Sequence, residues 1–494
     1  MKPAFRIATV ALLAAILAGC VPKKIVWSPD GQQAAVVANR QLYLCDADGN
    51  LSAPIADGVE DDTLSPVAWF PDSQRVLVVL KERVRQWQQI GGVLSDSVRN
   101  EIVTRAEQLR DDLAAYEGDW AQFESRALSG LSGEQNGAIR IYLRDHLAKG
   151  LEEHLSEGWW NSIQRASVEI RSLQIVNVDV NRKVAEARIA RTIDGILEIR
   201  ISPDGKKVAY VSAARELRDD GRLPDEATDA PTLFVVSADG NSEPQTVANY
   251  VAWFPDWSAD SRHLVYAQPS SPPATQDEDL VLGTISRRQV SGDDGTLLEA
   301  PGGTEALAGI IFNPVTKIRS LHDGRILFSA AEVHLPATGG DMPERASLFV
   351  VDPGRQATVT RAMPRQSEMH PVVEGLPIGL FETSPDGTRV AIAHEDGRVA
   401  IFNLDGGDIR LVQADNEKDN DKSPELRTMP TWRSNDELCF IVPPGSEYGS
   451  THRAEVVLLS ANDERHVLSN NWPAAVVNDL LGAADDPQAA DTLD

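Results

Sequence analysis

The chain is poor in cysteine and in basic residues. Its three cysteines, Cys20, Cys45 and Cys439, are too few and too scattered for a disulfide-rich scaffold or for a zinc site with paired ligands. Only 47 lysines and arginines stand against 74 aspartates and glutamates, which gives a net charge of -27. This excess argues against a nucleic-acid partner, because binding to phosphates requires clustered positive side chains.

Long apolar runs and catalytic motifs are also missing. After residue 20, no apolar stretch approaches the length of about 18 residues that a membrane-spanning helix needs. No Gly-x-Ser-x-Gly elbow of a serine hydrolase occurs, and residues 415–421 alternate acids without the glycine and glutamate of a calcium loop. His146 and His154 are not spaced as zinc ligands. The sequence therefore predicts no metal, no cofactor and no enzyme.

The first twenty residues have the pattern of an export signal. Lys2 and Arg6 flank the start of a short apolar run over residues 8–18, which is typical of a signal peptide. The run ends in Leu17-Ala18-Gly19-Cys20, which resembles the lipobox of bacterial lipoproteins. The resemblance implies cleavage after Gly19 and lipidation of the Cys20 sulfur. The alternative is an ordinary secretory signal in which the cysteine occurs by chance.

Lipidation at Cys20 would place the protein in the cell envelope. The acyl chains would hold the protein firmly at the membrane, since each buried methylene contributes about 0.8 kcal/mol of binding free energy. Val21 is not the aspartate that commonly retains lipoproteins in the inner membrane. In a Gram-negative cell, the resemblance therefore favours the outer membrane, facing the periplasm. The acidic body would not be attracted to anionic lipid.

One turn sequence recurs along the rest of the chain. In its clearest form, Trp27-Ser28-Pro29-Asp30-Gly31, proline presets the backbone, aspartate bonds the turn and glycine accepts positive φ. Each copy lies between short apolar segments that read as strands. The aspartate or its equivalent in the seven copies is Asp30, Asp72, Asp204, Asp260, Asp323, Asp386 and Asn435.

These units resemble the TolB-like, Pro-Asp variant of WD-type repeats, which form β-propellers. Units of four short strands, recurring at about 40 to 50 residues or somewhat more, are the signature of that fold. We predict an all-β propeller of seven four-stranded blades. Six is the alternative, because the copies at Leu321 and Trp432 are degenerate. The repeated tryptophans Trp27, Trp69, Trp257 and Trp432 are predicted to pack between blades.

The second unit contains a long insertion. The interval from Asp72 to Asp204 is more than twice any neighbouring interval, and residues 84–164 have helical periodicity. Ser95 is a predicted N-cap of one helix, and a second helix is expected from about residue 139 to 155, with Gly158 ending the helical segment. The insertion is either a decoration that shields the blade or a surface that binds a partner.

The expected organisation is a signal peptide over residues 1–19, propeller over 20–83 and 165–475, the insertion over 84–164, and an acidic disordered tail over 476–494. We predict a lipid-anchored, non-catalytic scaffold that binds an envelope protein or peptide. The alternative is an enzyme, or a protein that binds a glycan or small ligand, using the centre of the propeller. Cys45 and Cys439 fall in the first and last units, where a disulfide and two buried thiols both fit.

Overall fold

The computed structural model describes residues 22–60, 63–115, 133–147, 157–178, 187–212, 231–270, 281–333, 344–354, 359–361, 381–393, 399–405, 410–412, 429–442, 454–462 and 464–480. The predicted lipobox, Leu17 to Cys20, lies outside the described residues, as do residues 415–421 and His154.

Seven antiparallel sheets of four strands make up the described β-structure, and each sheet is built from four consecutive strands. Blades one and two are β1–β4 (Ile25–Trp27, Gln33–Ala38, Gln41–Asp46, Ala56–Asp57) and β5–β8 (Val67–Trp69, Arg75–Val84, Val168–Asn177, Ala187–Thr192). Blades three and four are β9–β12 (Ile196–Ile201, Lys207–Ser212, Thr232–Ser237, Gln245–Ala248) and β13–β16 (Asp256–Trp257, His263–Pro269, Leu282–Gln289, Thr304–Ile311).

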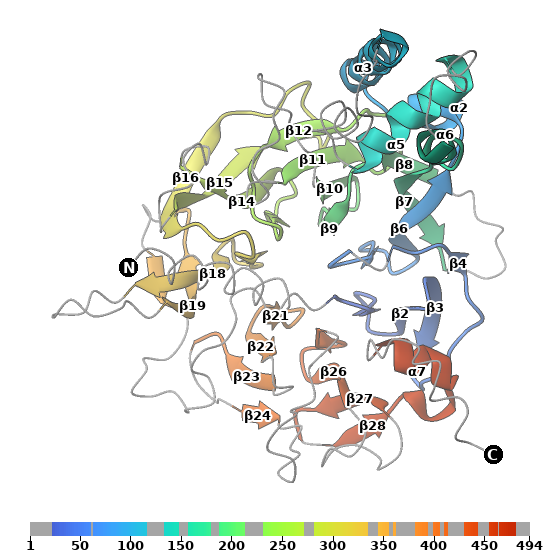
Figure 1. Cartoon of the computed structure of the whole chain (residues 1–494). Coiled ribbons are helices and arrows are strands. Elements are labelled where there is room, and N and C mark those ends of the chain that lie inside the picture. The colour runs from blue at the N-terminus through green and yellow to red at the C-terminus, as the bar shows by residue number, and fades with distance from the viewer. Residues whose placement is uncertain are drawn as a thin grey trace, which may run out of the picture.

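Blades five and six are β17–β20 (Ile318–Ser320, Ile326–Val333, Glu344–Val351, Val359–Arg361) and β21–β24 (Phe381–Thr383, Arg389–Ala393, Val399–Asn403, Arg410–Val412). Blade seven is β25–β28 (Thr431–Trp432, Glu437–Val442, Glu455–Ser460, Arg465–Val467). The sheets follow one another around a ring (Figure 1). The predicted seven-bladed propeller is confirmed, and the six-bladed alternative is wrong.

The first strands of neighbouring blades contact one another, so they form the inner wall of the ring. They all run in the same direction in a propeller, because every blade repeats the same antiparallel order. We call the side where the first strands begin the top face. The opposite side, where each first strand turns into the second, is the bottom face.

The recurring turns close the bottom face. In blade one, the hydroxyl of Ser28 donates to Asp30 Oδ1 over 2.6 Å, and Gly31 takes a φ of +69°. The same serine-to-aspartate bond recurs from Ser202, Ser258 and Ser384. Turns of adjacent blades also bond to each other, since the Asp30 N–H donates to Ser73 Oγ over 3.2 Å. The motif thus shapes these turns, and the N–H groups of Asp204 and Asp386 link to the following turn as that of Asp30 does.

The repeated tryptophans lie between blades as predicted. The indole N–H of Trp69 donates to the carbonyl of Val26 in the preceding blade over 2.8 Å, and Trp257 and Trp432 bond to Arg200 and Glu382 in the same way. All are buried. The indoles of Trp69, Trp257 and Trp432 therefore fill the space between two sheets and also satisfy a backbone carbonyl, whereas Trp27 is buried at its blade contact without such a bond.

The long connection between β6 and β7 is helical, as its periodicity predicts. Its helices are α2 (Trp87–Gly91), α3 (Asp96–Ala115), α5 (Gly133–Tyr142) with the π-turn η1 (Leu143–Leu147), and α6 (Glu157–Gln164). We call them together the helical lobe, and Figure 1 shows it at the periphery of the ring beside β7 and β8. Because a second-to-third-strand connection leaves the top face, the lobe belongs to that side.

Details of the lobe differ from expectation. The Ser95 hydroxyl accepts the Val98 N–H over 3.4 Å, which fits the predicted N-cap. The second helix begins at Gly133, six positions before the residue we expected, and Ala138 and Ile139 in its second half are buried in the lobe core. Gly158 does not end a helix but lies in the first turn of α6, where an added Cβ would meet nothing within 4 Å.

Blades one and seven close the ring without exchanging a strand. Arg433 of blade seven donates to the Gly31 carbonyl over 3.0 Å, and Cys45 and Cys439 share one apolar cluster as free thiols. Helix α7 (Ala474–Leu480) packs into the same cluster through Val476, Val477 and Leu480. The boundary expected between residues 475 and 476 therefore falls inside a buried helix.

Candidate functional site

One position recurs in the first strands, which form the inner wall of the ring. It is the residue just before the tryptophan position of the first strand, and in order it is Val26, Ala68, Arg200, Asp256, Arg319, Glu382 and Thr431. Blades three to six carry charges there, whereas blades seven, one and two carry apolar or small residues. The central wall is therefore charged on one side only.

Glu382 lies at the middle of a group of buried charges. Its carboxylate accepts from Lys317 Nζ over 2.6 Å and lies 3.0 Å from Lys23 Nζ and 3.3 Å from Arg319 Nη2. On the other side, Arg319 lies 4.0 Å from Asp256 Oδ1. On β9, Arg200 Nη2 lies 2.8 Å from Glu198 Oε1. We call the seven residues together the central cluster: Lys23, Glu198, Arg200, Asp256, Lys317, Arg319 and Glu382.

Burial and charge shift the pKa values in opposite directions. Burial acts to raise the pKa of Glu382, but Lys23, Lys317 and Arg319 outweigh it and hold the pKa well below its ordinary value. Burial lowers the pKa of Lys317 to about 7, because the attraction of Glu382 offsets only part of the loss of water. Burial also lowers the pKa of Lys23. The cluster thus holds a permanent anion between two lysines of lowered pKa and Arg319, whose pKa Glu382 and Asp256 raise against the effect of burial.

The central cluster joins five blades. Its members come from the segment before β1, from the first strands of blades three to six, and from Lys317 just before β17. Each charged group has an oppositely charged partner within the cluster. Glu198 is fully buried and lies beside Arg200, but among the described residues its oxygens accept no well-directed hydrogen bond. Mutual pairing accounts for these charges without a bound ligand.

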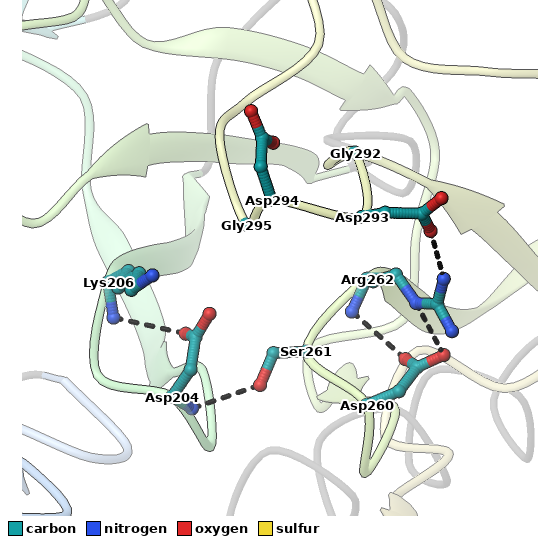
Figure 2. Close-up of a pocket in the computed structure, with 9 residues that line it drawn as sticks. All are labelled: Asp204, Lys206, Asp260, Ser261, Arg262, Gly292, Asp293, Asp294 and Gly295. Atoms are coloured by element: carbon teal, nitrogen blue, oxygen red, sulfur yellow. Dashed lines mark hydrogen bonds and ion pairs between the residues drawn. The ribbon is translucent and has the colours of Figure 1, made fainter.

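A second candidate lies on the bottom face, in a hollow of about 370 Å³ between blades three and four. Figure 2 shows Asp204 and Asp260 from two neighbouring turns below the loop of Gly292, Asp293, Asp294 and Gly295. The Asp204 N–H donates to Ser261 Oγ over 2.9 Å, and Arg262 pairs with both Asp260 and Asp293.

The acids of this hollow are already engaged. Burial acts to raise the pKa of Asp260, but hydrogen bonds from Ser258 and from the Arg262 backbone outweigh it, so the pKa falls to about 2. Asp294 accepts from the N–H and hydroxyl of Thr296. Across the part of the chain that the structure describes, no three His, Cys, Asp or Glu side chains are grouped to hold a metal ion. These carboxylates shape turns.

The residues that sequence reasoning proposed do not meet at either place. Gly19 and Cys20 lie outside the described residues, and the predicted lipidation stays a prediction. Cys45 and Cys439 are buried thiols at the ring closure, where burial raises the pKa of each to about 12. Sequence reasoning missed the central cluster. Alignment of the repeats would have shown charges at Arg200, Asp256, Arg319 and Glu382 before the tryptophan position, but not that other charged residues pair with them.

Comparison with known proteins gives similarity of fold only. No protein-family profile matches the chain, and no curated protein is similar to it in sequence. An oligogalacturonate lyase from Vibrio parahaemolyticus is 8% identical with a TM-score of 0.44, and 90% of each chain is covered. A TolB-like protein from Agrobacterium tumefaciens is 13% identical with a TM-score of 0.33, covering 60% of this chain and 87% of that one.

An acylaminoacyl peptidase from Pyrococcus horikoshii is 14% identical with a TM-score of 0.36, covering 60% of this chain and 41% of that one. The prediction that the chain is not an enzyme is contradicted by these comparisons, because the similar structures include a lyase and peptidases, and we withdraw it. Such distant likenesses assign no reaction or substrate to this chain.

Within the residues described, no helix is both long enough and apolar enough to cross a membrane.

Proposed function

We propose that this chain is a lipoprotein of the bacterial cell envelope whose propeller holds a protein or peptide partner at the membrane. The lipobox-like sequence that ends at Cys20 supports the anchor, and in a Gram-negative cell it favours the outer membrane, facing the periplasm. The observation that carries the partner-binding proposal is the helical lobe, which is built as a rigid addition to a ring that is already closed.

The lobe has a core of its own that continues into blade two. Its helices and the end of the β6–β7 hairpin share one buried cluster that includes Val84, Ile90, Ile102, Leu109, Ile139, Leu143, Trp159, Ile163, Val168 and Ile170. A side chain at Gly137 would meet the Ser167 carbonyl at 2.8 Å, so α5 lies directly against the start of β7. Such packing holds the lobe in one position relative to the ring.

Ion pairs fix the base of the lobe as well. Arg171 of β7 lies 3.1 Å from Glu60, which is almost fully buried, and 3.2 Å from Glu169. The carboxylate of Glu134 on α5 accepts the Glu169 N–H over 2.9 Å. These contacts connect blade two, the loop after β4 and α5. The lobe therefore presents its outer surface at a fixed orientation, as a binding surface requires.

Helix α3 supplies that outer surface. Ile102, Ala106 and Leu109 face the lobe core, and the opposite side exposes polar residues that include Glu107 and Gln108. The exposed side needs no contact for the stability of the ring. A shield for the blade would need only its buried side, so the exposed side is the place where we expect a partner.

The lobe can be removed without breaking blade two. Val84 and Val168 are directly paired, so residues 85–167 can be replaced by an Asn-Gly turn that closes the hairpin. Val84, Val168 and Ile170 would be changed to threonine in this variant, because loss of the lobe exposes them. We expect the variant to fold and to lose its partner in crosslinked envelopes.

Site-specific crosslinking locates the contact. A photoreactive residue at Gln108 should capture a partner that the same residue at Glu243, exposed on the bottom face, does not. Equal capture at both positions, or an unchanged partner in the variant without the lobe, would contradict the proposal. The lipid is tested separately, since incorporation of labelled fatty acid should be lost in Cys20→Ala.

A further inference from the structure

The chain is already fixed in the ring two residues after the predicted lipidation site. The Pro22 carbonyl accepts the N–H of Met429, which precedes the first strand of blade seven, over 3.2 Å. The next residue, Lys23, donates its N–H to the Leu64 carbonyl of blade two over 2.7 Å, and its side chain pairs with Glu382. Hydrogen bonds to blades seven and two, together with the ion pair to Glu382, therefore hold this segment in place.

This attachment lies on the top face, near the axis of the ring. Pro22 and Lys23 precede β1, and the residues that bond to them precede the first strands of blades seven and two. The two residues from Pro22 back to Cys20 span at most about 7 Å when fully extended. A lipid on Cys20 would therefore hold the centre of the top face within a short distance of the bilayer.

An exposed apolar side chain lies on the same face. Leu282 begins the third strand of blade four, at the end of the sheet where the first strand also begins. Its exposed fraction is 67%. Among the residues that the structure describes, it is the one large hydrophobic side chain that is exposed. A leucine at this place gains free energy when it enters the interfacial region of a membrane.

Carboxylates gather on the opposite face. The aspartates of the first turns, together with Asp293 and Asp294, all lie at the bottom. For Asp30, the hydrogen bond from Ser28 is the main cause of a lowered pKa, so the group stays ionised at neutral pH. Lysines and arginines of the same face pair with most of these carboxylates, as Arg75 does with Asp72, Lys207 with Asp204 and Arg325 with Asp323. The orientation is therefore carried by the tether and by Leu282, and not by charge.

We infer that the propeller stands on a phospholipid bilayer with its top face toward the lipid and its bottom face toward the aqueous compartment. This inference rests on the proposed lipid anchor and adds the orientation of the body. The partner held by the helical lobe would then lie close to the membrane surface, because the lobe belongs to the top face.

Fluorescence quenching in proteoliposomes tests the orientation. The lipidated full-length protein carries one introduced cysteine, at Leu282→Cys on the top face or Glu243→Cys on the bottom face, labelled with a fluorophore. Cys45 and Cys439 are buried and should not react. Vesicles of phosphatidylethanolamine and phosphatidylglycerol contain a lipid with a quencher on its headgroup. With a tether of about 7 Å, we expect quenching at 282 to be at least about twofold stronger than at 243.

A linker variant serves as the control. A Gly-Ser linker of about 30 residues between Cys20 and Val21 would keep the lipid but free the body over roughly 30 Å, and the difference between the two labels should disappear. Equal quenching of a short-tethered protein that floats with the vesicles would overturn the orientation and leave the lipid anchor intact. Failure to float would reject the anchor itself, and with it the orientation.

Discussion

The Nζ of Lys23 lies 3.0 Å from Oε2 of Glu382, across the centre of the ring. The pair joins the segment before the first blade to the first strand of the sixth. Lys317 and Arg319 of the fifth blade also form ion pairs with Glu382. One buried carboxylate thus holds together parts of the chain that are far apart in sequence, and its removal should have a large effect.

Glu382→Gln should destabilise the fold by about 3 to 5 kcal/mol, because three buried cations would lose their common anion. Lys23→Met is the matched control, since it leaves Glu382 with two cationic partners and should cost clearly less. Urea denaturation followed by tryptophan fluorescence measures both. If the glutamine variant is within about 1 kcal/mol of the wild type, the cluster does not stabilise the ring.

Lys317 predicts how stability depends on pH. Burial lowers its pKa in the folded state to about 7, whereas the ordinary value in an unfolded chain is 10.5. Between these values the unfolded state binds a proton that the folded state does not. The free energy of unfolding should therefore rise with pH above 7, by at most about 1.4 kcal/mol per pH unit.

The comparison with Lys317→Met isolates this effect, because methionine has a similar length and no charge. The stability of the wild type minus that of the variant should increase between about pH 7 and pH 9 and stay flat below pH 7. Urea denaturation of both proteins across that range provides the measurement. Parallel curves would show that Lys317 keeps its proton in the fold.

Sequence predicted the parts of this fold that repeat. In four of the described first turns a serine bonds to the aspartate two residues later, as Ser28 does to Asp30, so the residues of the turn themselves determine its shape. The insertion was visible for the same reason, since α3 has buried residues at helical spacing. The end of the propeller was misplaced because Val476 and Leu480 gain their burial from blades one and seven, not from neighbours in sequence.

The central cluster could not be predicted in that way. Glu382 lies between Phe381 and Thr383 in a short strand, where a charged residue ordinarily faces water. Only closure of the ring brings it to Lys23 and Lys317. The predicted lipidation of Cys20, in contrast, rests on a motif alone, and the residues described do not include it.

The two cysteines of the ring closure should be unreactive thiols. Burial raises the pKa of Cys45 and Cys439 to about 12, so almost no thiolate forms at neutral pH. In a Cys20→Ala variant, iodoacetamide should modify neither residue in the native protein and both after unfolding. Intact mass measures the modification. A native mass lower by two hydrogens, with no alkylation after unfolding, would instead indicate a disulfide between them.

Among the glycines of the recurring first turns, Gly31 should be the most sensitive to replacement by alanine. It has a φ of +69°, and a Cβ there would meet the Arg433 carbonyl of blade seven at 2.8 Å. Gly324 occupies the equivalent place in blade five with a φ of +86°, but nothing lies within 4 Å of its Cβ position. In both alanine variants, the strained backbone should lower the free energy of unfolding by about 1 to 2 kcal/mol.

Gly31→Ala should lose more than Gly324→Ala, because it also pushes blade seven away from blade one and weakens the bond from Arg433 to the Gly31 carbonyl. Thermal unfolding of both variants measures the difference. Opening of the ring should in addition expose Cys45 and Cys439, so the first variant should react with iodoacetamide faster than the second. Equal losses and equal thiol reactivity would show that contact between the first and last blades does not depend on this turn.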